Sequence, residues 1–157
     1  MTIKLVCIGK TDQQELEALI QVYFKRLQHY IKFEIDIIPD LKKLKNLNEN
    51  LQKIKEGELI LADIQTSDFL VLLDENGKQM GSEQFSEFIQ KKLNMGLKRL
   101  IFVIGGPYGF SDQVYSRANQ KVSLSKMTFS HQMIRLFFTE QLYRAFTILK
   151  NEPYHHR

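Results

Sequence analysis

Short apolar runs alternate with longer amphipathic segments from one end of the chain to the other. Runs of strand length occupy residues 3–8, 33–38, 69–73, 100–104 and, more briefly, 122–124. Between them, apolar residues recur at three- and four-residue steps, which predicts helices over 16–31, 46–63, 82–96, 112–118 and 131–150. The runs 69–73 and 100–104 contain no polar residue, which is typical of strands buried on both faces of a parallel sheet.

A few residues predict where these elements begin and end. Thr11 or Asp12 is the expected cap of the first helix, and Ser130 is the expected cap of the last. Gly57 is a weak point that can split the second helix. Residues 75–78, with the order Glu-Asn-Gly-Lys, predict a turn directly after the third strand.

The alternation of strands and helices predicts an α/β fold. We expect one domain over residues 1–157, built on a mostly parallel sheet with helices on both faces. Ligands of such sheets bind at the carboxyl ends of the strands. This rule directs attention to the residues that follow Leu73, Ile104 and Leu124.

Composition narrows the class of protein without defining it. Hydrophobic residues make up 43% and charged residues 25% of the chain, which excludes disordered and coiled-coil classes. The net charge of +4 permits a phosphate-rich partner but does not require one. A single cysteine, Cys7, is expected in the core and favours a cytoplasmic protein. We expect no signal peptide, no membrane span and no metal site, because the apolar runs are short and no zinc-type spacing occurs.

Two segments at the strand ends are candidates for ligand binding. Residues 105–109, Gly-Gly-Pro-Tyr-Gly, expose backbone amides after a buried strand, although an ordinary tight turn would have the same composition. Residues 124–129, Leu-Ser-Lys-Met-Thr-Phe, offer hydroxyls and a cation where the last strand leads into a helix. The start of an ordinary helix would look similar.

The last residues concentrate polar chemistry after a very apolar helix. Tyr154, His155, His156 and Arg157 include groups that titrate near neutral pH and groups that pair with phosphate. A frayed polar terminus is the alternative interpretation. No nucleophile elbow or Ser-His-Asp arrangement is present.

Four segments in a fixed order resemble one family. They are Ile104 to Gly109, Leu124 to Gln132, Glu140 to Ala145, and the ending Pro153-Tyr154-His155. Together they resemble the ribosomal RNA large subunit methyltransferase H family, the pseudouridine N3-methyltransferases of the SPOUT class. The resemblance extends over the whole chain, but His156 separates His155 from Arg157, where the family usually continues directly with a basic residue.

The resemblance implies a fold, a cofactor and partners. It implies a C-terminal trefoil knot, a homodimer, and a substrate pseudouridine in large-subunit (23S) rRNA of the assembled ribosome. It implies that S-adenosylmethionine contacts Leu73, Gly105, Leu124, Ser125, Lys126, Met127, Thr128 and Phe129. It implies catalytic roles for Tyr154, His155 and Arg157, as a base and a phosphate clamp acting from the tail.

Other functions stay open on the sequence alone. A ribosome- or RNA-binding module with the same fold would bind RNA without turnover, and a flavodoxin-type oxidoreductase would be yellow when purified. Seven basic residues are candidate phosphate contacts, or else solvated helix faces: Lys42, Lys43, Lys45, Lys91, Lys92, Lys98 and Arg99.

Overall fold

A computed structural model describes residues 1–41 and 47–156 and shows five parallel strands in one sheet, in the order β2-β1-β4-β3-β5. The strands are β1 (Thr2–Ile8), β2 (Lys32–Ile38), β3 (Phe69–Gln79), β4 (Arg99–Ile104) and β5 (Gln120–Ser123). The helices are α1 (Gln14–Leu27), α2 (Glu49–Ala62), α3 (Ser82–Asn94), α4 (Asp112–Arg117) and α5 (Met133–Leu149).

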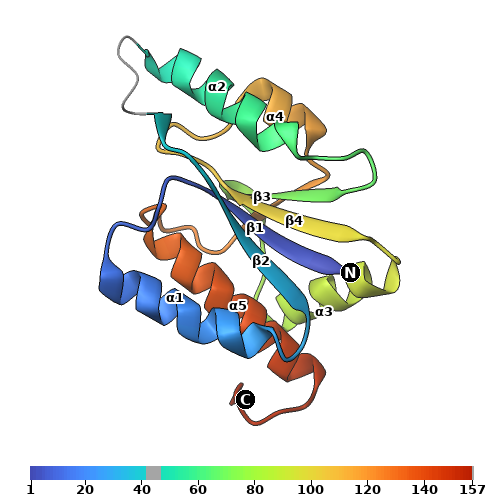
Figure 1. The fold of residues 1–157 in the computed structure, drawn as a ribbon. Coiled ribbons are helices and arrows are strands. Elements are labelled where there is room, and N and C mark those ends of the chain that lie inside the picture. The colour runs from blue at the N-terminus through green and yellow to red at the C-terminus, as the bar shows by residue number, and fades with distance from the viewer. Residues whose placement is uncertain (42–46, 157) are drawn as a thin grey trace.

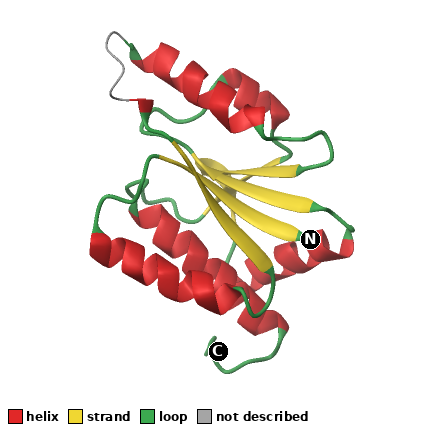
Figure 2. Cartoon of the chain, in the orientation of Figure 1, coloured by secondary structure: helices red, strands yellow, loops and turns green. Residues whose placement is uncertain are grey.

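Helices cover both faces of the sheet. Helices α2 and α4 lie on one face, and α1, α3 and α5 lie on the other (Figure 1). The strands fan out between these two helical layers (Figure 2). This arrangement confirms the predicted α/β sheet with helices on both sides. The candidate lysines 42, 43 and 45 lie outside the described residues.

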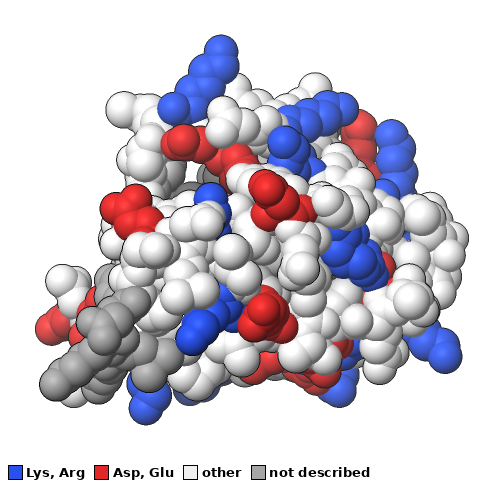
Figure 3. Space-filling model, turned by 90° about the horizontal axis from the view of Figure 1, so that it is seen from above, with Lys and Arg blue, Asp and Glu red and all other residues white. Residues whose placement is uncertain are grey.

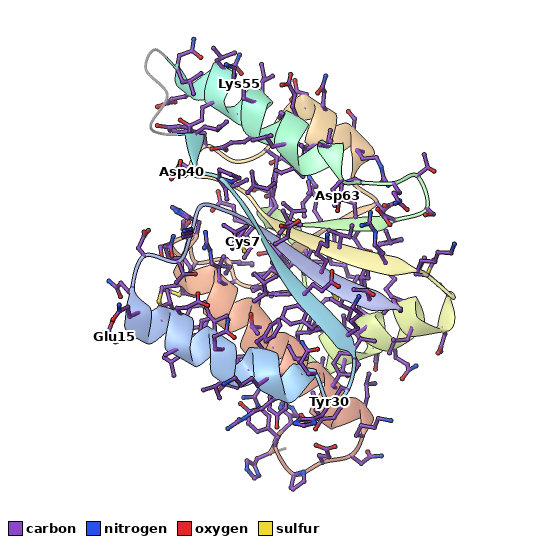
Figure 4. The ribbon with its side chains drawn as sticks, in the orientation of Figure 1. Cys7, Glu15, Tyr30, Asp40, Lys55 and Asp63 are labelled. Atoms are coloured by element: carbon purple, nitrogen blue, oxygen red, sulfur yellow. The ribbon has the colours of Figure 1, made fainter. Side chains whose placement is uncertain are left out.

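The all-apolar runs form the buried centre, as predicted. Strand β4 pairs with β1 and β3, and its residues Leu100 to Ile104 are buried. The Phe102 ring lies 4.7 Å from that of Phe138 on α5 and also packs against Phe85 and Phe88 on α3. On β1, Cys7 is fully buried among these side chains (Figure 4), and burial raises the pKa of its thiol to about 12. Cys7 is therefore a core residue rather than a nucleophile.

The predicted turn at residues 75–78 is wrong. Strand β3 continues to Gln79, with a shift of register between Leu73 and Lys78 in its pairing with β5. A Cβ atom on Gly77 would lie 2.6 Å from the backbone of Val122. Pairing with a distant strand has therefore overridden the local turn signal, and Gly77 allows the two backbones to approach closely.

The first helix begins and ends elsewhere than predicted. It starts at Gln14 after the N-cap residue Gln13, and it ends at Leu27 although the apolar spacing continues to Ile31. The hydroxyl of Thr11 instead accepts a hydrogen bond from Arg135 at 3.2 Å, and the amide of Asp12 donates to Gln132 at 3.1 Å. Both expected caps are thus used to attach this loop to α5.

Helix α2 is not split at Gly57. A Cβ atom at this position would lie 2.3 Å from the Ser111 hydroxyl oxygen, at the cap of α4. The glycine is explained by the close approach of α2 and α4 rather than by a break in the helix. In the described part of the chain, no helix is long and apolar enough to cross a membrane.

Candidate functional site

A cavity of about 660 Å³ lies where the carboxyl ends of β4 and β5 and the register shift of β3 meet the start of α5. Its wall comes from residues 73–76, 104–110, 122–125 and 127–131, together with Tyr115 and Ile134. The segments that follow Leu73, Ile104 and Leu124 therefore form one pocket, as expected, although β3 itself continues to Gln79. Seven of the eight residues expected to contact a cofactor line it: Leu73, Gly105, Leu124, Ser125, Met127, Thr128 and Phe129. Lys126 is not among the lining residues.

The glycine loop presents its backbone to this pocket. It closes with a hydrogen bond of 3.1 Å from the Gly109 amide to the Gly106 carbonyl, and Gly109 has a φ of 78°, which favours glycine. A Cβ on Gly105 would lie 3.1 Å from the Phe110 ring, and one on Gly106 would lie 2.5 Å from a Glu56 carboxylate oxygen. The segment therefore forms the expected tight turn, and its glycines allow Phe110 and Glu56 to pack closely against it.

Hydroxyl groups fix the conformation of the segment between β5 and α5. The Ser123 hydroxyl donates to the Ser125 carbonyl at 2.7 Å, and the Ser125 hydroxyl accepts from the Met127 amide at 2.9 Å. The Ser130 hydroxyl accepts from the Met133 amide at 3.1 Å, but α5 begins at Met133 after the N-cap residue Gln132, so the predicted cap lies two residues before the observed one. These hydrogen bonds define the path of the chain between β5 and α5.

Two carboxylates stand at the pocket wall next to the register shift of β3. Asp74 accepts a hydrogen bond from the Tyr115 hydroxyl at 2.5 Å, and Glu75 accepts one from the Thr128 hydroxyl at 3.0 Å. Burial, together with the hydrogen bond to Asp74, raises the pKa of Tyr115, so this phenol stays protonated. The sequence pattern indicates neither Glu75 nor Tyr115 as a pocket residue. Glu75 falls in the predicted turn, and Tyr115 falls in a short predicted helix with no binding motif.

A buried arginine joins the start of α5 to the end of β1. Arg135 is 2% exposed, and its guanidinium donates to the carbonyls of Ile8 at 2.8 Å and Gly9 at 2.9 Å, as well as to Thr11. These carbonyl acceptors satisfy the guanidinium inside the protein. Arg135 therefore fixes the position of the helix that follows the pocket, and no sequence pattern had marked it.

The C-terminal tail lies at the opposite end of α5 from the pocket. This helix has 17 residues, about 25 Å of length, between the pocket residues at its start and the tail after its end (Figure 1). The structure therefore does not bring Tyr154 or His155 to the pocket of the same chain. Arg157 lies outside the described residues.

Side-chain contacts hold the tail in place as far as His155, so these residues do not form a frayed terminus. The Tyr154 hydroxyl donates to Glu140 at 2.9 Å, and its ring packs on that of Tyr143 with centroids 4.7 Å apart. Glu152 accepts a hydrogen bond from Tyr30, which lies beside the tail (Figure 4). Burial and hydrogen bonds to Tyr23 and Glu140 raise the pKa of Tyr154, so its phenol is protonated at neutral pH.

Arg144 connects His155 to helix α5. A guanidinium nitrogen of Arg144 lies 3.3 Å from Nδ1 of His155, and Arg144 also forms an ion pair with Glu140. The His155 ring is therefore held close to α5. Among the described residues, no group of three or more His, Cys, Asp or Glu side chains is arranged to hold a metal ion.

Comparison with known proteins identifies the class to which this fold and pocket belong. Residues 1–155 match the family described as "Predicted SPOUT methyltransferase". The chain therefore belongs to the SPOUT methyltransferase family, and it is a methyltransferase.

Its relatives carry one particular name, "Ribosomal RNA large subunit methyltransferase H". The chain is 80% identical to the protein of that name from Christiangramia forsetii and 64% identical to that from Flavobacterium johnsoniae, in both cases over 157 residues and 100% of each chain. It is 61% identical to that from Parabacteroides distasonis over 156 residues, 99% of each chain. These matches confirm the family resemblance inferred from the four sequence segments.

Proposed function

We propose that this chain transfers a methyl group from S-adenosylmethionine to N3 of a pseudouridine in large-subunit rRNA of the assembled ribosome. The observation that supports the proposal is the pocket, which is lined by seven of the eight residues expected to contact the cofactor. The chain that contains this pocket belongs to a methyltransferase family. The name shared by its relatives supports the rRNA substrate. A ribosomal substrate is consistent with a cytoplasmic enzyme.

The residues of the pocket fit this cofactor. Its volume lies within the usual range for small-molecule sites, and it combines glycine backbone, apolar side chains and hydroxyl groups. Among its described lining residues are two carboxylates and no Lys or Arg, which suits a ligand with a sulfonium and an ammonium. When bound, the cofactor supplies an already activated methyl group. The chain's own residues then have to hold the acceptor base in line and assist the loss of its N3 proton.

In a homodimer, the pocket of one chain and the tail of the other would form one site. Each chain has both, at opposite ends of α5, so a second copy with its α5 antiparallel would place its tail at the first copy's pocket. Exposed apolar residues support such a contact: Met127 is 73% exposed at the pocket, Met133 lies on α5, and Leu19 and Val22 lie on α1. The trefoil knot implied by the family belongs to the same proposal.

The tail then supplies groups that assist the loss of the N3 proton. Tyr154 donates its one hydroxyl proton to Glu140, and Arg144 contacts the ring of His155 at 3.3 Å, so both side chains are held in position. An imidazole ring nitrogen placed beside the acceptor base would serve as the general base for that proton. Arg157 is proposed as the phosphate contact that its chemistry favours.

The face of the molecule over α2 and α4 carries mixed charge. Positive and negative side chains of the described residues are interspersed on it (Figure 3). Of the described candidates for phosphate contacts, Arg99 pairs with Asp63 and Asp68, and Lys92 packs over the Phe69 ring at 3.8 Å. Lys91 and Lys98 are the exposed members of this set. Shape and the dimer surface are therefore expected to contribute more to recognition than charge.

Methyl transfer to ribosomes tests the proposed function directly. Methyl-labelled S-adenosylmethionine is supplied with assembled ribosomes, free large subunits or naked rRNA, all from cells that lack this activity. Label is expected on assembled ribosomes and at the N3 of one pseudouridine. No label on any of the three, with cofactor binding demonstrated, would contradict the proposed substrate.

Mixing two inactive variants tests the shared site. A Gly105→Val chain has a blocked pocket and an intact tail, whereas a His155→Ala chain has the reverse. If each site uses the pocket of one chain and the tail of the other, unfolding and refolding the mixture restores about a quarter of the wild-type sites, because half of the dimers are mixed and each has one intact site. Activity that stays at the level of the separate variants would exclude a site shared between chains.

A further inference from the structure

The charge of the pocket is opposite to that of the protein. The chain carries a net charge of +4, yet the charged side chains among the described lining residues, His131 aside, are the carboxylates Asp74 and Glu75. Lys126, the cation of the neighbouring segment, is not part of the lining. The ammonium of Lys121 on β5 lies 5.5 Å from the centroid of the Tyr115 ring.

Backbone irregularity and hydrogen bonds hold the two carboxylates at the pocket. The register shift of β3 lies between Leu73 and Lys78, so Asp74 and Glu75 leave the regular ladder where the pocket begins. Asp74 is held on both oxygens, by the Asn76 amide at 2.8 Å and the Tyr115 hydroxyl at 2.5 Å. Glu75 is held by Thr128, which belongs to the segment expected to contact the cofactor. These hydrogen bonds orient both carboxylates.

We propose that Asp74 and Glu75 make this pocket selective for the positive charge of its cofactor. This inference rests on the proposed function. S-adenosylmethionine differs from its product, S-adenosylhomocysteine, by one methyl group and the sulfonium charge, and the two share the adenine, ribose, ammonium and carboxylate groups. Carboxylates that attract the sulfonium strengthen binding of the substrate form alone. Transfer of the methyl group removes that attraction, so the same two residues favour exchange of spent cofactor for fresh cofactor.

Binding calorimetry on the full-length protein separates this effect from a general loss of affinity. Dissociation constants for S-adenosylmethionine and S-adenosylhomocysteine are measured for the wild type, Asp74→Asn, Glu75→Gln and the double variant. Glu75→Gln keeps an oxygen that can accept from Thr128. Asp74→Asn keeps an oxygen that can accept from the Asn76 amide, and its NH₂ group can donate to the Tyr115 hydroxyl oxygen. Each substitution is expected to lower the affinity for S-adenosylmethionine by about three- to tenfold, the size of one charge interaction in a half-open site. The affinity for S-adenosylhomocysteine is expected to stay nearly unchanged.

One control variant isolates charge at the pocket. Glu87→Gln removes an exposed carboxylate of α3 that lies outside the pocket. It is expected to keep the wild-type ratio of the two affinities. Equal weakening of both ligands in Asp74→Asn and Glu75→Gln, or no change in either, would overturn charge selection while leaving the cofactor site intact. A wild-type protein that binds neither ligand would instead overturn the proposed cofactor, and the selection with it.

Discussion

Replacing Gly105 by valine is expected to lower the affinity for S-adenosylmethionine about 100-fold or more and to abolish methyl transfer, because overpacking and lost ligand contacts act together. A Cβ atom alone would lie 3.1 to 3.4 Å from three atoms of the Phe110 ring, and the valine methyl groups extend beyond it. They have to displace Phe110, which is buried, or enter the pocket. Calorimetry measures the affinity, and label transfer to ribosomes measures the activity.

Gly81→Ala is the matched control for this substitution. Gly81 has no atom within 4 Å of its Cβ position, and it lies at the cap of α3 rather than in the pocket at the strand ends. We expect this variant to bind and transfer like the wild type. A Gly105→Val protein that is folded and still binds the cofactor with wild-type affinity would show that the glycine loop is not part of the binding site.

Arg135→Met is expected to lower the free energy of unfolding by about 3 kcal/mol or more, since each buried acceptor left without a donor costs about 1–3 kcal/mol. The variant removes the donor from the carbonyls of Ile8 and Gly9 and from the Thr11 hydroxyl, and methionine cannot replace these hydrogen bonds. Urea denaturation, followed by circular dichroism at one protein concentration, measures the change.

Arg26→Met provides the comparison for Arg135→Met. Arg26 is an exposed residue of α1 whose guanidinium lies 5.4 Å from the centroid of the Tyr23 ring. Its loss is expected to change stability by about 1 kcal/mol or less, the range of an exposed cation–π contact. If both variants unfold at the same urea concentration, the hydrogen bonds between Arg135 and the end of β1 do not contribute measurably to stability.

Local patterns predicted the elements that depend on local rules. The all-apolar runs at 69–73 and 100–104 became the central strands, because a strand buried on both faces has no position for a polar residue. The meeting of the segments after Leu73, Ile104 and Leu124 also followed from the sequence, because parallel strands end at the same edge of a sheet. The glycine loop and seven pocket residues could be named on that basis and on the family resemblance.

Contacts between distant segments decided the rest. Residues 75–78 have the composition of a turn, but pairing with β5 extends the strand and places Glu75 at the pocket. Thr11 has the chemistry of a helix cap, but Arg135, 124 positions later, uses its hydroxyl. Gly57 resembles a helix break, but Ser111 of the neighbouring helix accounts for it.

The sequence by itself determined the order of strands and helices, the edge of the sheet that carries the pocket, and the family to which the chain belongs. The tertiary structure alone decided which side chains reach that pocket and that the tail lies at the far end of α5. The physical reason is that hydrophobic periodicity reports which face of an element is buried, whereas hydrogen bonds such as those of Arg135 and Glu75 depend on partners that only folding brings together.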